Sequence, residues 1–288
     1  GVSALLSNTT GSSNVAIGYE AMLFNTEGLR NVAIGRNSLY SSTTGSNNIG
    51  LGFNTLASVQ TGSANMAIGH EALRFNVSGF QNIGIGYLSC FLVLGNNNTG
   101  IGALSLRELK YGNDNTAIGV SSSQSIGKST AAANTISGRS YVIETIGTTD
   151  FTLIGAASNT VGLQFTANSA GTGTGTVSPV TEDNVAIGTN ADQLRIQGDN
   201  CIVIGHGASA SSNTFTSNEI TLGNASVSRF RVPGLSIDWT STTKPPTLTS
   251  VPATSTSTGV AGQVAYDADY FYVCVATNTW KRSALTTW

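Results

Sequence analysis

The sequence predicts an all-β fold, a β-solenoid in which a unit of 17 residues repeats along the chain. Asparagine recurs at positions 14, 31, 48, 65, 82, 98 and 115, in steps of 17 residues with one step of 16. Each asparagine precedes a short apolar alternation that ends in glycine, as in "NVAIG" at 14–18. Only 10% of the residues are charged and 40% are hydrophobic, and no helical periodicity is sustained. A fixed repeat of this length is typical of stacked β coils.

The apolar positions of one unit predict its strand and its core. With asparagine as position 1, positions 2 and 4 are mostly Val or Ile and position 3 is Ala or Gly, which is the period-2 pattern of a strand. Position 9 is again apolar. We therefore expect Ile68 at position 4 and Leu73 at position 9 to point inward, and His70 at position 6 to lie on an outward corner. Positions 6, 7 and 10 to 14 vary freely and are predicted to face outward.

Glycine and asparagine are predicted to shape the coil. Position 5 is always Gly and position 15 is Gly in every complete unit of 17 residues, so both are expected at corners where a β-carbon is disfavoured. The asparagine at position 1 is expected to form a ladder in which each amide bonds to its copies above and below. One coil holds about three large apolar residues, so its stability must come from stacking on neighbouring coils.

The repeat register divides the chain. It is lost after the seventh asparagine and returns in "NVAIG" at 184–188, "CIVIG" at 201–205 and "EITLG" at 219–223. A stretch rich in Pro, Ser and Thr follows, and the chain ends in alternating strands with short turns. We predict β-roll repeats over 1–120, an inserted small β module over 121–181, a second β-roll stretch over 182–235, a linker over 236–258 and a C-terminal β tip module over 259–288.

Composition excludes several classes of function. The net charge of −2 lacks the basic excess of a nucleic-acid-binding protein. The three cysteines, Cys90, Cys201 and Cys274, are far apart and odd in number, so they predict buried thiols and neither a disulfide framework nor a metal site. The chain begins inside a repeat, and we expect it to be a fragment of a longer protein, from whose start no signal peptide or membrane span can be inferred.

Catalytic motifs are weak. "IGKST" at 126–130 ends like a phosphate-binding loop, but the glycine that the loop requires is replaced by Ser122. His70 and His206 both occupy position 6, and the repeat fixes no nucleophile or carboxylate beside them. A polysaccharide hydrolase would need paired carboxylates. Two pairs are candidates, and turn chemistry explains both more simply: Asp192 with Asp199, and Asp267 with Asp269. We expect no enzyme, cofactor or metal.

Three stretches carry a resemblance. The "NVAIG" coils resemble the heads of trimeric bacterial adhesins and many phage tail fibres, in which three chains wind side by side as left-handed parallel β-rolls. Residues 147–177 and 262–285, "GTTDFTLIGAASNTVGLQFTANSAGTGTGTV" and "GQVAYDADYFYVCVATNTWKRSAL", are similar to modules of tailed-phage structural proteins. "NEITLGNASVSRFRVPGL" at 218–235 resembles the stretch that often precedes a C-terminal chaperone domain in fibres.

The resemblance implies a structural tail fibre, or its distal part, that presents a receptor-binding tip for host attachment. The resemblance also implies a homotrimer, an extracellular location in the virion, and contacts with other tail or baseplate proteins. The receptor would be a host polysaccharide or protein, with no nucleic acid and no membrane insertion. Two alternatives stay open: a tailspike polysaccharide depolymerase, and the head of a trimeric bacterial surface adhesin.

The C-terminal module is the predicted site of recognition. Strand alternation separates Phe271, Val273 and Val275, which we expect in the core, from Tyr270, Tyr272 and Cys274. Aromatic rings that stack on a sugar, next to cations that bond its polar groups, are typical of a binding patch. The candidate residues are Tyr270, Tyr272, Trp280, Lys281 and Arg282. Alternatively, the tyrosines pack against neighbouring chains. The outward corners of the solenoid are then the better candidates, such as Tyr19, Phe53, His70 and Tyr87.

Overall fold

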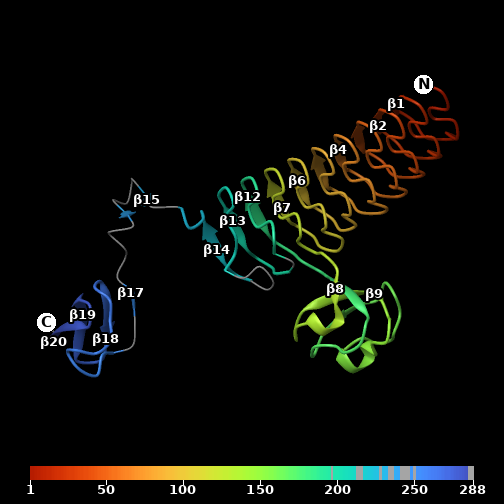
Figure 1. Cartoon of the computed structure of the whole chain (residues 1–288). Helices are drawn as coiled ribbons and strands as arrows, with labels where there is room; N and C mark the ends of the chain where they lie inside the picture. The colour runs from red at the N-terminus through yellow and green to blue at the C-terminus, as the bar shows by residue number, and fades with distance from the viewer. Residues whose placement is uncertain are drawn as a thin grey trace. The chain divides into compact units, whose positions relative to one another are not determined.

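The computed structural model describes residues 1–195, 197–211, 217–226, 229–232, 237–240, 247–248 and 251–284, of which 229–232, 237–240 and 247–248 are described by backbone alone. Its described part consists of β-strands and two short 3₁₀ turns (Figure 1). The chain divides into two compact units, residues 1–224 and 225–288. Over the described residues, no helix has the length and apolar character needed to cross a membrane. The all-β class and the parallel solenoid are confirmed.

The solenoid is one continuous parallel sheet of ten strands. Each three-residue strand pairs in register with the strand of the next coil, as Val15 does with Val32. The strand of Thr116 pairs directly with that of Val185, so the two predicted roll stretches form a single stack. The strands are β1 (Val15–Ile17), β2 (Val32–Ile34), β3 (Ile49–Leu51), β4 (Met66–Ile68), β5 (Ile83–Ile85), β6 (Thr99–Ile101), β7 (Thr116–Ile118), β12 (Val185–Ile187), β13 (Ile202–Ile204) and β14 (Ile220–Leu222).

The predicted asparagine ladder is present and buried. The backbone N–H of Asn31 donates to Asn14 Oδ1 at 2.9 Å, and Asn31 Nδ2 donates to the carbonyl of Gly45 at 2.8 Å. The ladder continues across the insertion, because Asn184 Nδ2 donates to Asn115 Oδ1 at 2.9 Å. Each amide thus satisfies backbone groups of its own coil and of the next one, which a buried polar side chain requires.

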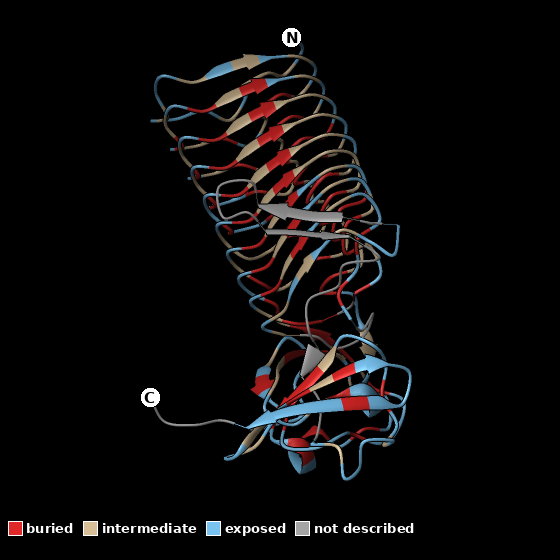
Figure 2. Cartoon of the chain, turned by 90° about the vertical axis from the view of Figure 1, so that its left-hand side faces the viewer, coloured by how far each residue is buried: buried red, intermediate tan, exposed pale blue. Residues whose placement is uncertain are grey.

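The predicted orientation of the strand residues is wrong. Position 3 points into the coil, where Ala33 and Ala67 are fully buried, whereas positions 2 and 4 point outward (Figure 2). Ile68 is therefore on the outer face, and Leu73 alone of the expected pair lies in the core. The interior beside the strand is narrow: at Gly50 even a β-carbon would lie 2.4 Å from Ser38 Oγ.

The core is filled from the opposite leg of the coil. Residues at position 9 are buried, and position 12 is buried as well, against the prediction that it faces outward. Position 6 is exposed at His70, as predicted. The large side chains of this core are Met22, Leu39, Leu56, Val59, Leu73, Cys90, Val93, Leu106 and Leu109.

The two glycines of a unit act differently. Gly52, at position 5, has a φ of +135°, so the predicted corner that disfavours a β-carbon is confirmed. Gly45, at position 15, is required by close approach, because a β-carbon there would lie 2.4 Å from the carbonyl oxygen of Gly62. Non-glycine residues also take left-handed conformations, including the core residue Leu39 at φ 53°.

The inserted module leaves the stack between β7 and β12. It comprises β8 (Thr130–Ala131), η1 (Ala132–Asn134), β9 (Ser140–Thr145), η2 (Phe151–Ile154), β10 (Gln164–Thr166) and β11 (Thr176–Pro179). These strands form a sheet in the order β10-β9-β11-β8 around Tyr141, Phe151 and Phe165. The module has its own core.

Polar contacts hold the module on the solenoid. Tyr141 Oη donates to Gln197 Oε1 at 2.7 Å, and Arg139 pairs with Asp199 at 2.7 Å. Lys110 pairs with Glu144 at 2.5 Å. The insertion is therefore attached to the coils on either side of the point where it leaves the stack.

The first coil after the insertion has an ionic core. Asp192 occupies position 9, where the coils from Met22 to Leu106 carry an apolar residue, and forms a fully buried ion pair with Arg195. Arg195 Nε donates to Asp192 Oδ2 at 2.7 Å, and Nη2 donates to Asn184 Oδ1 at 3.0 Å. Asp192 lies in a turn, with a φ of 51°, in agreement with the turn interpretation. Its carboxylate pairs with Arg195, whereas that of Asp199 pairs with Arg139, so the two do not form a carboxylate pair.

The second unit contains two small sheets. β15 (Arg229–Val232) and β16 (Ile237–Thr240) form an antiparallel hairpin. The other sheet has the order β17-β18-β19-β20, with β17 (Thr247–Leu248), β18 (Gln263–Tyr266), β19 (Tyr270–Ala276) and β20 (Thr279–Ala284). The predicted domain boundary at residue 235 lies outside the described residues. β17, within the predicted linker, pairs with β18.

Candidate functional site

The two faces of the C-terminal hairpin are the reverse of those predicted. Tyr272, Cys274 and Trp280 are 7%, 0% and 5% exposed, whereas Phe271 and Val275 are 39% and 47% exposed. Trp280 lies across from Cys274 in the β19–β20 register, so the largest ring of the hairpin shares a face with the tyrosines. That face is buried because the chain before β18 covers it. The predicted core of Phe271, Val273 and Val275 is therefore wrong.

The covering segment fixes Trp280. The backbone N–H of Trp280 donates to the Ser255 carbonyl at 2.8 Å, and its indole Nε1 donates to the Ser257 carbonyl at 3.0 Å. Gly259 lies against the indole, because a β-carbon there would come within 2.7 Å of the ring. The backbone N–H of Gly259 donates to Asn278 Oδ1 at 2.9 Å. Residues 255–259, which composition alone assigns mostly to a linker, thus hold a tryptophan in place.

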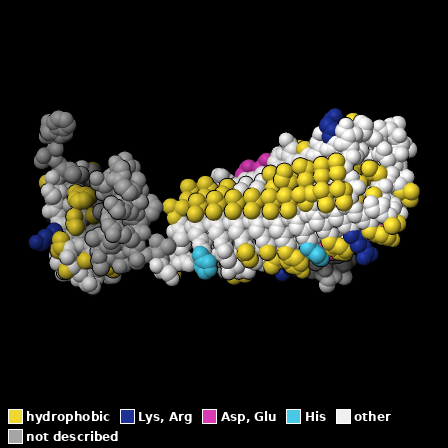
Figure 3. All heavy atoms as spheres, turned by 90° about the horizontal axis from the view of Figure 1, so that it is seen from above, with side chains coloured by type: hydrophobic (Ala, Val, Ile, Leu, Met, Phe, Trp, Pro, Cys, Tyr) yellow, Lys and Arg dark blue, Asp and Glu magenta, His cyan; other side chains and the backbone are white. Residues whose placement is uncertain are grey.

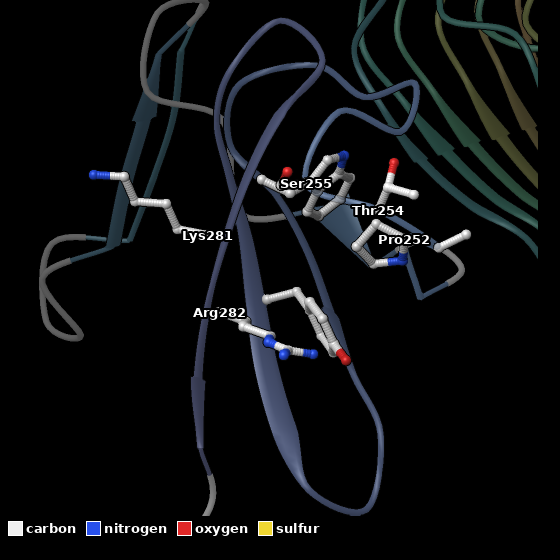
Figure 4. A pocket seen from close by; sticks show the side chains of 8 residues that line it. Pro252, Thr254, Ser255, Lys281 and Arg282 are labelled. Atoms are coloured by element: carbon white, nitrogen blue, oxygen red, sulfur yellow. The ribbon is translucent and has the colours of Figure 1, made fainter.

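A pocket of about 340 Å³ lies beside this tryptophan (Figure 4). It brings together four of the five predicted site residues and adds four residues from the preceding segment. The sequence did not identify these four, because their small or hydroxylated side chains are typical of a linker. Tyr270, the fifth, is packed next to it, with its ring centroid 6.1 Å from that of Tyr272. The lining residues are Pro252, Ala253, Thr254, Ser255, Tyr272, Trp280, Lys281 and Arg282.

The side chains of the two cationic lining residues, Lys281 and Arg282, point in different directions. Arg282 lies opposite Tyr272 in the β19–β20 register, and its guanidinium carbon is 4.2 Å from the centroid of the Tyr270 ring. Lys281 lies opposite Val273, on the other face of the hairpin, and Figure 4 shows its side chain extending away from the labelled pocket residues. Only Arg282 combines with the aromatic rings as the sequence predicts.

Asp267 orders the edge of the site. Its carboxylate accepts hydrogen bonds from Tyr272 Oη at 2.7 Å and from the backbone N–H groups of Asp269 and Tyr270 at 2.9 and 2.7 Å. The bond from Tyr272 lowers the pKa of Asp267 and raises the pKa of Tyr272. The turn interpretation of Asp267 and Asp269 is thereby supported.

The outward corners form a second surface. Rings at position 6 stack along successive coils: the centroids of Phe53 and His70 are 5.1 Å apart, and those of His70 and Tyr87 are 5.5 Å apart. Arg36 lies between Tyr19 and Phe53, at 5.4 and 5.9 Å from their centroids. These side chains cover one another's faces and present mainly edges to solvent, so they form a stabilising ladder more readily than a platform for sugars.

The remaining chemical candidates are structural. All three cysteines are buried, and desolvation raises the pKa of Cys90 to about 12, which leaves it unreactive at neutral pH. Within the described ranges, no three His, Cys, Asp or Glu residues gather as a metal site.

Comparison with known proteins finds short similarities to two phage proteins. Over 39 residues, the chain is 59% identical to a capsule K30/K69-specific depolymerase of Klebsiella phage K64-1. Over 38 residues it is 58% identical to depolymerase 1, with the same capsule specificity, of Klebsiella phage K5-2. The matches cover 14% and 13% of this chain and 5% of each relative, so the chain matches a small part of these proteins. No family model and no solved structure matches the chain.

Proposed function

We propose that the chain is the distal part of a structural phage tail fibre that presents a receptor-binding tip to the host cell. Three copies would lie parallel as left-handed β-rolls in the extracellular virion, joined to other tail or baseplate proteins. In this proposal the chain is not an enzyme. The observation that carries it is an uncovered apolar band along the solenoid.

The band is made by positions 2 and 4 of every coil. Figure 3 shows hydrophobic side chains gathered in a continuous band along the solenoid. Ten strands about 4.8 Å apart give it a length of about 43 Å. Apolar bands of this extent mark interaction surfaces, and identical copies around a closed symmetry axis would cover it. Its most exposed members are Val15, Ile17, Ile34, Ile118, Ile187, Ile204, Ile220 and Leu222.

Two further observations support the proposal. The short matches are to proteins of Klebsiella phages, which favours a phage origin over a cell-anchored adhesin. The C-terminal module holds a pocket with aromatic and cationic lining, as a binding tip would require.

Light scattering on the purified chain tests the assembly. We expect three times the chain mass of 29.5 kDa, and a stable monomer would contradict the proposal. Labelling phage particles with antibody against this chain should mark the far ends of the tail fibres in electron micrographs. Label confined to the capsid would contradict the location.

A tailspike depolymerase is the second candidate, because both relatives carry that name. A polar pocket of about 560 Å³ between the inserted module and the second roll stretch includes Glu182 and Asp199. Asp199 is paired with Arg139, and Glu182 accepts a hydrogen bond from Asn113 Nδ2 at 3.1 Å, so both carboxylates already have partners. Incubation with purified capsular polysaccharide separates the candidates, since shortening of the polysaccharide is expected only of the depolymerase.

A further inference from the structure

We propose that the C-terminal pocket binds an acidic saccharide, with the sugar carboxylate on Arg282. This inference rests on the proposed function, because it names the ligand class of the receptor-binding tip. It follows from the charge of the pocket, from the geometry of Arg282, and from the shape and lining of the walls.

The charge of the pocket selects an anion. The cation of the lining that faces the aromatic rings is Arg282, and the lining has no acidic side chain, although acidic residues outnumber basic ones in the chain by 15 to 13. The nearby carboxylate of Asp267 is occupied by three hydrogen bonds from Tyr272 and the turn backbone. Within the described part of the chain, no ion pair joins Arg282 to a carboxylate, although its charge contributes to lowering the pKa of Asp267. The side chain is exposed, so a ligand can reach the guanidinium.

The geometry of Arg282 suits a carboxylate. Stacking on the Tyr270 ring, at 4.2 Å from its centroid, restrains the guanidinium, and the side chain remains exposed to solvent. A restrained guanidinium presents two parallel N–H donors that match the two oxygens of a carboxylate. A lysine ammonium offers only a point charge, and Lys281 extends away from the pocket.

The walls suit a sugar rather than a bare anion. Trp280 and Tyr272 provide an aromatic wall, and the exposed hydroxyls of Thr254 and Ser255 can bond to sugar hydroxyls. Two hydrogen bonds hold Trp280, so the wall is formed before the ligand arrives. A volume of about 340 Å³ is at the lower end of the range for small-molecule pockets, ~300–1,000 Å³, which favours a short saccharide segment.

Calorimetric titration of the full chain tests the ligand class. The probes are trigalacturonate and the neutral galactose trisaccharide with the same linkages. We expect trigalacturonate to bind at least ~tenfold more tightly than the neutral trisaccharide, with the difference reduced by added salt. Arg282→Gln should abolish the preference, whereas Lys281→Gln, the matched control on the adjacent residue, should retain it. Thermal melting of each variant checks that the module stays folded.

The outcomes are separable. Equal affinity for the two trisaccharides, no binding of either, or equal losses in the Arg282→Gln and Lys281→Gln variants would overturn the acidic ligand. Attachment of the labelled full chain to host cells is measured in parallel. If the chain attaches to host cells but shows no preference for trigalacturonate, the receptor-binding tip is retained with another ligand. If the chain attaches to no host cell, the proposed function itself is overturned.

Discussion

The solenoid and the C-terminal hairpin were both predicted from alternating patterns, and in both the buried face is the opposite of the one expected. In the solenoid, Ala and Gly face inward and Ile faces outward. In the hairpin, Tyr272 and Cys274 face inward, whereas Phe271 and Val275 are exposed. Alternation identifies two faces, but the space available on each side decides which one is buried. The solenoid interior is narrow, and in the described part of the hairpin unit the segment before β18 covers the face that carries Trp280.

The largest loss of stability is expected from a substitution in β4, where two adjacent residues face opposite sides. Ala67→Asp would place an unpaired charge in the dry interior of each chain, at a cost of about 4 kcal/mol or more, so the solenoid should melt far below the wild type. Ile68→Asp, on the outer face, should leave each roll folded but dissociate the proposed trimer. Circular dichroism and light scattering on both variants check this. Equal loss of melting temperature would show that the assignment of faces is wrong.

Substitutions of Asp192 and Arg195 compare the coil that has an ionic core with the coils that have an apolar core. Asp192→Leu leaves Arg195 buried without its partner, and we expect a loss of about 3–5 kcal/mol. The double variant Asp192→Leu with Arg195→Met replaces the pair by apolar groups like those of other coils and should recover most of that loss. Chemical denaturation measures both. If the double variant is no more stable than the single one, the ion pair stabilises the coil in its own right, beyond neutralising the charge of buried Arg195.

The hairpin faces are compared by two aromatic truncations. Trp280→Ala removes the buried ring and should cost about 3–5 kcal/mol in the second unit. Phe271→Ala removes an exposed ring and should cost less than about 1 kcal/mol in an isolated chain. Unfolding of this unit can be followed by hydrogen exchange of the β19 amides. A larger effect at Phe271 would mean that a partner chain covers that face.

The smallest effect is expected on the outward corner. His70→Ala removes two ring contacts, with Phe53 and Tyr87, and should lower stability by about 0.5–1.5 kcal/mol. Thermal melting checks the value, with Thr189→Ala, at the same position of a coil without the ladder, as the control. A drop as large as that of Ala67→Asp would place position 6 in the structural core.

The repeat, the strands and the asparagine ladder could be predicted from the amino-acid sequence alone. A 17-residue period forces equivalent residues into register, so the stacking of "NVAIG" and the burial of asparagine follow from the spacing alone. Leu73 in the core and the corner at Gly52 follow equally from local pattern. Most residues of the candidate site could also be predicted, since Tyr272, Trp280 and Arg282 line one pocket.

Which faces are buried, and which distant side chains are in contact, depends on the tertiary packing. The stacking of β12 on β7 joins residues far apart in the chain across an insertion, and the ion pair of Asp192 with Arg195 replaces an apolar core at that seam. Lys281 and Arg282 are neighbours in sequence, yet strand geometry sends them to opposite faces, and the segment that closes the pocket has the composition of a linker. Such contacts depend on volume and on distant chain segments, which a local pattern does not encode.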